Sequence, residues 1–171
     1  GALIAPFAFL GSKYDPVLRE VYTSISTENI LKKRGLLGGL LSDALSDNRP
    51  LWMLMSKYVD QALLDAIAEE YAKGRLLMIG TVNLDSQRSV VWNIGAIAAT
   101  KDPKSVDLVR SILIASAAIP AAFPPVMIDV EAGGQKYQEM HVDGGCLHEV
   151  FLYPTSFVPL ELAKPTRVTR D

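Results

Sequence analysis

The sequence predicts a three-layer α/β fold with a mixed central sheet, because helical and strand patterns are interspersed along the chain. The chain has 171 residues, of which 49% are hydrophobic. This is enough for one substantial core and too little for two ordinary domains. The charged fraction is 21% and the formal net charge is −2. Because the sequence contains no basic stripe, we expect no nucleic-acid partner.

The first half of the chain carries mainly helical patterns. Residues 1–10 form an apolar segment that predicts a buried helix, kinked or restarted at Pro6. Apolar residues then recur on one helical face within residues 17–25, and again within residues 60–71. Gly74 follows the second of these patterns at the position of a C-terminal cap.

From residue 76 onward, strand patterns alternate with short turns. The predicted elements are strands at 76–82 and 89–94, a helix at 107–117, and strands at 125–130 and 137–142. Gly133 and Gly134 stand between the last two strands, and paired glycines at such a position indicate a hairpin.

Asp143 is the residue that most strongly suggests chemistry. It follows the last predicted strand, and Gly144 and Gly145 after it allow the backbone to turn sharply. Taken alone, Asp-Gly is a routine turn dipeptide, so a purely structural turn stays open at this point. His141 would share the strand face of Asp143. We interpret His141 as a polar residue on a half-exposed strand.

A metal-dependent hydrolase is a further hypothesis, with His141, Asp143 and His148 as ligands. Their spacing matches no established ligand motif, and a good site needs three or four placed ligands. We therefore expect no metal site. The lone Cys146 excludes an internal disulfide, and we interpret it as a buried, inert thiol. Ser116 lacks the glycines of a nucleophile elbow, so we interpret it as a small packing residue.

Several ordered blocks of the sequence resemble the patatin-like phospholipase family. The block at 114–126 is similar to the family's Ala-Ser-x-Ala-x-Pro-x-x-Phe-x-Pro segment. In the family this segment precedes an Asp-Gly-Gly/Ala motif by a short hairpin, and here it precedes Asp143-Gly144-Gly145 in the same way. Residues 74–85 and 91–93 look like the family's strand–turn–strand block. The resemblance covers about residues 1–150.

The resemblance implies a patatin-like fold that is truncated at its N-terminus. The opening residues 1–5 look like the sequence that directly follows the serine in Gly-x-Ser-x-Gly. Gly1 would then be the last glycine of the elbow, and the serine would lie two residues before it. Neither this motif nor a Gly-rich oxyanion segment occurs in the sequence. We therefore expect residues 1–171 to form a single partial catalytic domain without these two segments, with a peripheral tail at about 151–171.

The resemblance also implies a carboxylic-ester hydrolase that acts on lipids through a Ser–Asp dyad. Asp143 would be the base that deprotonates the serine, and Gly144 and Gly145 would form the turn that follows it. The substrates would be phospholipids, lysophospholipids or related acyl esters, and no cofactor is implied. Because the nucleophile is absent, we expect the chain alone to be inactive.

A non-catalytic lipid-binding or scaffold protein on the same fold is the alternative that stays open. A serine in an upstream elbow would favour the enzyme, and its absence would favour the scaffold. The basic run Lys32-Lys33-Arg34 is typical of a solvated surface, although in a hydrolase it could make a peripheral contact with a membrane. The apolar cluster at 52–55 could line an acyl pocket, but such clusters are more often core. No feature of the sequence indicates a compartment.

Overall fold

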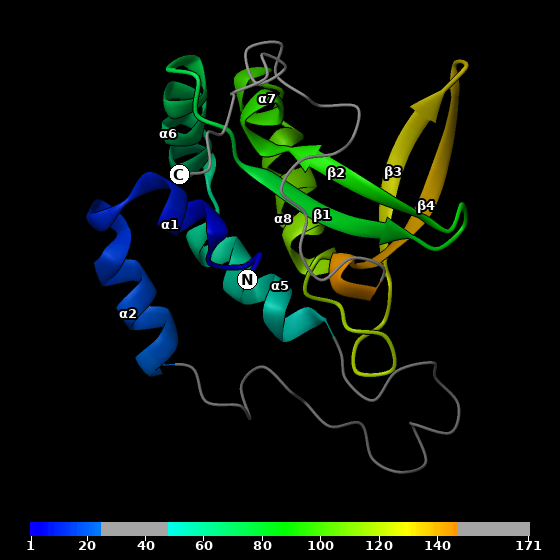
Figure 1. The fold of residues 1–171 in the computed structure, drawn as a ribbon, viewed down its shortest axis with the longest axis horizontal. Helices are drawn as coiled ribbons and strands as arrows, with labels where there is room; N and C mark the ends of the chain where they lie inside the picture. Colours follow the sequence, from blue (N-terminus) through cyan, green and yellow to red (C-terminus); the bar gives the residue numbers. More distant parts are fainter. Residues whose placement is uncertain (25–47, 147–171) are drawn as a thin grey trace, which may run out of the picture.

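The computed structural model of the chain describes residues 1–24 and 48–146 (Figure 1). The helices are α1 (Ala5–Leu10), α2 (Asp15–Ser24), α5 (Arg49–Tyr58), α6 (Gln61–Ala72), α7 (Ile94–Ala99) and α8 (Ser105–Ala115), with the 3-10 turns η1 (Ser12–Tyr14) and η2 (Gly144–Cys146). The strands are β1 (Met78–Asn83), β2 (Arg88–Asn93), β3 (Val126–Ala132) and β4 (Gln135–Asp143). The predicted tail at 151–171, the basic run at 32–34 and His148 lie outside the described residues.

The four strands form one sheet in the order β2-β1-β4-β3, and each of its three pairings is antiparallel. Two hairpins, β1–β2 and β3–β4, build this sheet. The second hairpin turns at Gly133 and Gly134, whose φ angles are +61° and +76°, as the sequence predicts. The expected mixed sheet is not formed by the described strands, which pair only antiparallel. A tight hairpin turn reverses the chain and makes its two strands antiparallel, whereas parallel neighbours require a long crossover connection.

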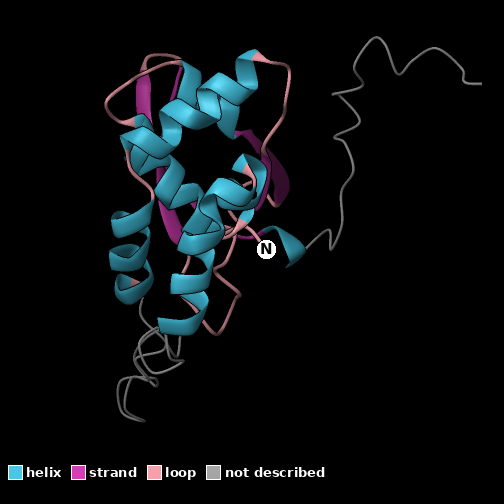
Figure 2. Cartoon of the chain, turned by 90° about the vertical axis from the view of Figure 1, so that its left-hand side faces the viewer, coloured by secondary structure: helices cyan, strands magenta, loops and turns pink. Residues whose placement is uncertain are grey.

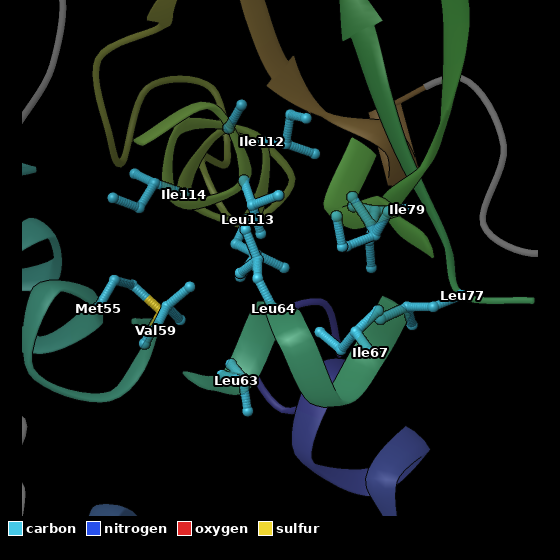
Figure 3. Packing of buried hydrophobic residues seen from close by; sticks show 14 of the residues in the cluster. Met55, Val59, Leu63, Leu64, Ile67, Leu77, Ile79, Ile112, Leu113 and Ile114 are labelled. Atoms are coloured by element: carbon cyan, nitrogen blue, oxygen red, sulfur yellow. The ribbon is translucent and has the colours of Figure 1, made fainter. Parts of the chain in front are cut away.

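The described helices lie on one side of the sheet (Figures 1 and 2). One core joins the two layers (Figure 3), and its buried members include Leu64 of α6, Leu113 of α8 and Ile79 of β1. On the other face of the sheet, Met127 is 48% exposed and Met140 is 36% exposed. The α/β fold class is therefore confirmed, with two of the three predicted layers formed by the described residues.

Local capping signals explain the ends of α6. The Asp60 side chain accepts a hydrogen bond from the Leu63 backbone N–H at 2.9 Å, which satisfies one of the free donors at the helix start. At the other end, Gly74 has a φ angle of +89°, and its N–H donates to the Tyr71 carbonyl at 2.9 Å. Both ends lie where the sequence pattern predicts them.

The first ten residues form a turn followed by a helix. The Ile4 N–H donates to the Gly1 carbonyl at 3.2 Å, and α1 then begins at Ala5. Pro6 lies in the first turn of α1, where its missing N–H removes no helical hydrogen bond. The predicted helix over residues 1–10 is therefore only partly correct, because residues 2–4 form a turn and the helix begins at Ala5 without a kink or restart at Pro6.

Two helices were not predicted from the sequence. The cluster at 52–55 lies in α5, where Met55 is buried but Met53 is 71% exposed, so the cluster is only partly core. The short helix α7 directly follows β2, and the Asn93 side chain caps it by accepting the Ala96 N–H at 2.9 Å. Among the described residues, none of the helices has the length and apolarity that crossing a bilayer requires.

We expect Gly95→Ala to destabilise the chain by about 1–2 kcal/mol, because its added methyl group would overpack the contact between α7 and α6. A Cβ at Gly95 would lie 2.5 Å from Cδ2 and 2.8 Å from Cβ of Tyr71. In an open helix the same substitution would stabilise by up to about 1 kcal/mol. Urea unfolding measures the change in the free energy of unfolding.

A Tyr71→Gly background is the matched control for this substitution, because it removes the Cβ of Tyr71 as well as its ring. The alanine at position 95 has space there, so adding it should be neutral or stabilising. If Gly95→Ala instead stabilises the chain that retains Tyr71, the close packing of the two helices is wrong.

Candidate active site

A pocket of about 450 Å³ lies between the start of the chain, the start of β1 and the end of β4. Gly1, Asp143, Gly144 and Gly145 all line it, so the structure brings the predicted site residues together. Ser116, at the end of α8, lines the same pocket. A larger pocket of about 540 Å³ lies beside α8 and β3, and none of the predicted site residues lines it.

Asp143 is held at the end of β4 by its backbone. It pairs with Thr81 of β1, and its N–H donates to the Ala118 carbonyl at 3.0 Å. Ala118 belongs to the 114–126 block, so two separate sequence motifs meet at this hydrogen bond. The Asp143 backbone is thus fixed from two directions, by a neighbouring strand and by the turn after α8.

The Asp143 carboxylate is half-buried, and one of its oxygens is engaged. Oδ1 accepts the Gly145 N–H at 2.8 Å, a contact that sets the orientation of the carboxylate. Among residues 1–24 and 48–146, Oδ2 has no hydrogen-bond donor. This second oxygen is therefore available to accept a proton from a group that enters the pocket.

Gly144 allows η2 to pack directly on β1. A Cβ at this position would lie 2.7 Å from the carbonyl oxygen of Gly80 and 2.8 Å from its carbonyl carbon. These are backbone atoms of a paired strand, so they cannot move aside as a flexible side chain would. The first glycine after Asp143 is therefore required by close approach of two backbones, and it does more than permit a turn.

His141 is completely buried, so the prediction of a half-exposed strand position is wrong. Its Nδ1 lies 2.9 Å from Thr81 Oγ1, and its Nε2 lies 3.2 Å from Glu139 Oε2. Because both ring nitrogens have partners, the imidazole can be buried without unsatisfied polar atoms. The neighbouring sequence gave no sign of this, since Thr81 lies 60 positions away.

No group of three or more His, Cys, Asp or Glu side chains within the described ranges is suited to hold a metal ion. The proposed ligand His148 falls outside those ranges. Cys146 is exposed, so the prediction of a buried thiol is also wrong. Partial desolvation, together with the nearby negative charge of Asp143, raises the pKa of the Cys146 thiol.

We expect Asp143→Asn to increase the rate at which iodoacetamide alkylates Cys146 near neutral pH. The thiolate is the reactive form, and removing the nearby negative charge lowers the thiol pKa. The increase should be only a few-fold, because desolvation makes the larger contribution to the raised pKa. The chain has one cysteine, so mass spectrometry of the total label measures the rate directly.

Asp129→Asn is the control for this measurement, because it makes the same charge change on β3. It should leave the alkylation rate unchanged. An equal rate in wild type and Asp143→Asn would contradict the placement of the Asp143 charge beside Cys146.

A family model described as Patatin-like phospholipase matches residues 1–155, a range that includes every residue of the pocket. Comparison with curated proteins gave no match. The family is one of lipid acyl hydrolases, and its members act on lipid substrates. The match spans most of the chain, and the α/β architecture agrees with it. The chain therefore belongs to the patatin-like phospholipase family.

Proposed function

We propose that the chain supplies the catalytic base of a carboxylic-ester hydrolase that uses a Ser–Asp dyad. One observation carries this proposal: Gly1 and Asp143, at opposite ends of the described residues, line the same pocket. A serine two residues before Gly1 would lie at most about 7.6 Å from it between Cα atoms, because each peptide step spans about 3.8 Å. The pocket beside Asp143 is therefore within reach of that serine.

The Oδ2 oxygen of Asp143, which has no donor among the described residues, suits the role of general base. A serine hydroxyl is a weak nucleophile until a base accepts its proton from within about 2.6–3.2 Å. Asp143 Oδ2 would accept this proton as serine attacks the ester carbonyl, while the Gly145 N–H keeps the carboxylate oriented through Oδ1. Asp143 would then return the proton to the leaving alcohol, which leaves an acyl-serine.

Water would complete the cycle by the same route. Asp143 would take a proton from water as it attacks the acyl-serine, and would give a proton back to serine when the fatty acid leaves. Both steps create a negatively charged oxygen that needs hydrogen-bond donors, a contribution commonly worth about 3–4 kcal/mol per donor. We assign these donors to a Gly-rich segment that precedes Gly1.

The remaining walls of the pocket suit an acyl ester. The pocket is also lined by four residues with apolar side chains, Ala2, Ala5, Met78 and Ile79. An acyl chain could lie against them while its ester carbonyl reaches the dyad. We therefore propose phospholipids, lysophospholipids or related acyl esters as substrates. Ile119, next to the residue whose carbonyl holds Asp143, is 55% exposed and would suit a peripheral contact with lipid.

In the hydrolase that includes the upstream elbow, we expect Asp143→Asn to lower kcat about 100- to 10,000-fold. Asparagine has nearly the same shape and can still accept the Gly145 N–H, but it cannot accept the serine proton. The thermal unfolding temperature should therefore change little. Hydrolysis of p-nitrophenyl acyl esters measures kcat, and calorimetry measures unfolding.

Near-wild-type turnover in Asp143→Asn would reduce Asp143 to a turn residue and would contradict the Ser–Asp dyad. Absence of turnover in the unsubstituted protein that includes the upstream segment would favour the lipid-binding scaffold. The 171-residue chain alone is the second control, and it should not hydrolyse these esters. Saturable hydrolysis by this chain that disappears in Ser116→Ala would show that Ser116 is the nucleophile and would contradict the upstream serine.

A further inference from the structure

A buried polar network crosses three strands beside Asp143. Trp92 on β2 donates its Nε1–H to Thr81 Oγ1 on β1 at 2.8 Å. The same oxygen lies 2.9 Å from His141 Nδ1 on β4, and His141 Nε2 lies 3.2 Å from Glu139 Oε2. Thr81 and His141 have no exposed surface, and the Trp92 and His141 rings lie 5.5 Å apart between centroids.

This network lies on the same face of the sheet as the Asp143 side chain. Thr81 stands directly opposite Asp143 in the pairing of β1 with β4, and opposite residues of antiparallel strands share a face. His141 lies two residues before Asp143 on β4, so it also shares that face. Thr81 therefore contacts His141, and it also lies opposite Asp143 in the pairing of β1 with β4.

The partners of the network define where its protons lie. An ionised Glu139 only accepts hydrogen bonds, so His141 Nε2 carries a hydrogen. A neutral imidazole with its hydrogen on Nε2 accepts at Nδ1, so the Thr81 hydroxyl donates to His141 Nδ1 while its oxygen accepts the Trp92 N–H. The direction of donation thus runs from Trp92 through Thr81 and His141 to Glu139.

We infer that Thr81 and His141 are positioning residues for Asp143, an inference that rests on the proposed catalytic role of Asp143. Apolar side chains could fill this space, but apolar contact tolerates small displacements of one strand along another. Directed hydrogen bonds of 2.8–2.9 Å do not tolerate such displacements, because their energy depends on distance and angle. By fixing β4 against β1, the network sets how far the Asp143 carboxylate extends into the pocket, where a general base requires a separation of about 2.6–3.2 Å.

The test is Thr81→Val in the hydrolase that includes its upstream elbow. Valine has the shape of threonine but leaves Trp92 Nε1 and His141 Nδ1 without their shared partner. We expect kcat to fall about ten-fold or more with little change in KM, because displacement of a catalytic group by 1 Å can cost roughly 100-fold. Thr81→Ser restores the hydroxyl and should recover most of kcat.

Two further variants separate positioning from general loss of stability. Thr100→Val removes a hydroxyl that bonds the Ile97 carbonyl and Ser105, outside the pocket, and it should lower the unfolding temperature without changing kcat. Trp92→Phe removes only the outer donor of the network, so kcat should fall less than in Thr81→Val. Trp92→Phe therefore tests the inference in a folded protein if Thr81→Val fails to fold. Unchanged kcat in Trp92→Phe and Thr81→Val would overturn the inference.

Nitrogen NMR tests the network without any assay of catalysis. The chain has two histidines, so the ring signals of His141 can be assigned with His148→Gln. We expect His141 to carry its proton on Nε2, with Nδ1 as acceptor, and a proton on Nδ1 instead would overturn the network.

Loss of activity in Asp143→Asn with full activity in Thr81→Val would refute the positioning role alone. Full activity in Asp143→Asn would refute the catalytic role on which it rests.

Discussion

Three residue pairs join β1 to β4, and the position of the candidate site depends on this short ladder. The β1–β2 and β3–β4 hairpins are each closed by their own local turns, but only this ladder makes them one sheet. The pair of Thr81 with Asp143 is its last one, so β4 ends where β1 still continues toward Met78. Asp143 thereby reaches the pocket that Gly1 lines from the opposite end of the described chain.

Close contacts around this last pair leave the chain little freedom. The Ala118 carbonyl accepts the Asp143 N–H, Gly144 packs against the Gly80 backbone, and the Gly145 N–H holds one carboxylate oxygen. The first two contacts come from distant segments and fix the backbone at residues 143 and 144, and the third is a local contact that orients the carboxylate. This arrangement suits a group that must meet a nucleophile at a fixed distance, because catalytic groups are most effective when their supporting contacts are rigid.

The sequence predicted the features that depend on neighbouring residues. The hairpin at Gly133 and the C-terminal cap at Gly74 are local signals, and both were predicted correctly. The six-residue helix α7 is too short for a periodic pattern, and its one local signal is the capping side chain of Asn93. The burial of His141 had no local signal, because it depends on Thr81 from another strand.

The candidate site was predictable in its residues and not in its geometry. The Asp-Gly-Gly motif and the 114–126 block identified Asp143 through their resemblance to a family, and the family match supports that resemblance. The meeting of these two motifs at the Ala118 carbonyl, and the approach of Gly1 to the same pocket, depend on how distant segments pack together. Periodicity along one chain does not encode such contacts.

In the dyad that we propose, Asp143 activates a serine that precedes Gly1. The most direct test is covalent labelling of the protein that includes the upstream segment with a fluorophosphonate, followed by peptide mass spectrometry. Such reagents modify a serine that an adjacent base has activated. We expect one adduct, on the serine two residues before Gly1, formed far more slowly in Asp143→Asn. An adduct on Ser116, or labelling of the upstream serine at an equal rate in Asp143→Asn, would contradict the Ser–Asp dyad.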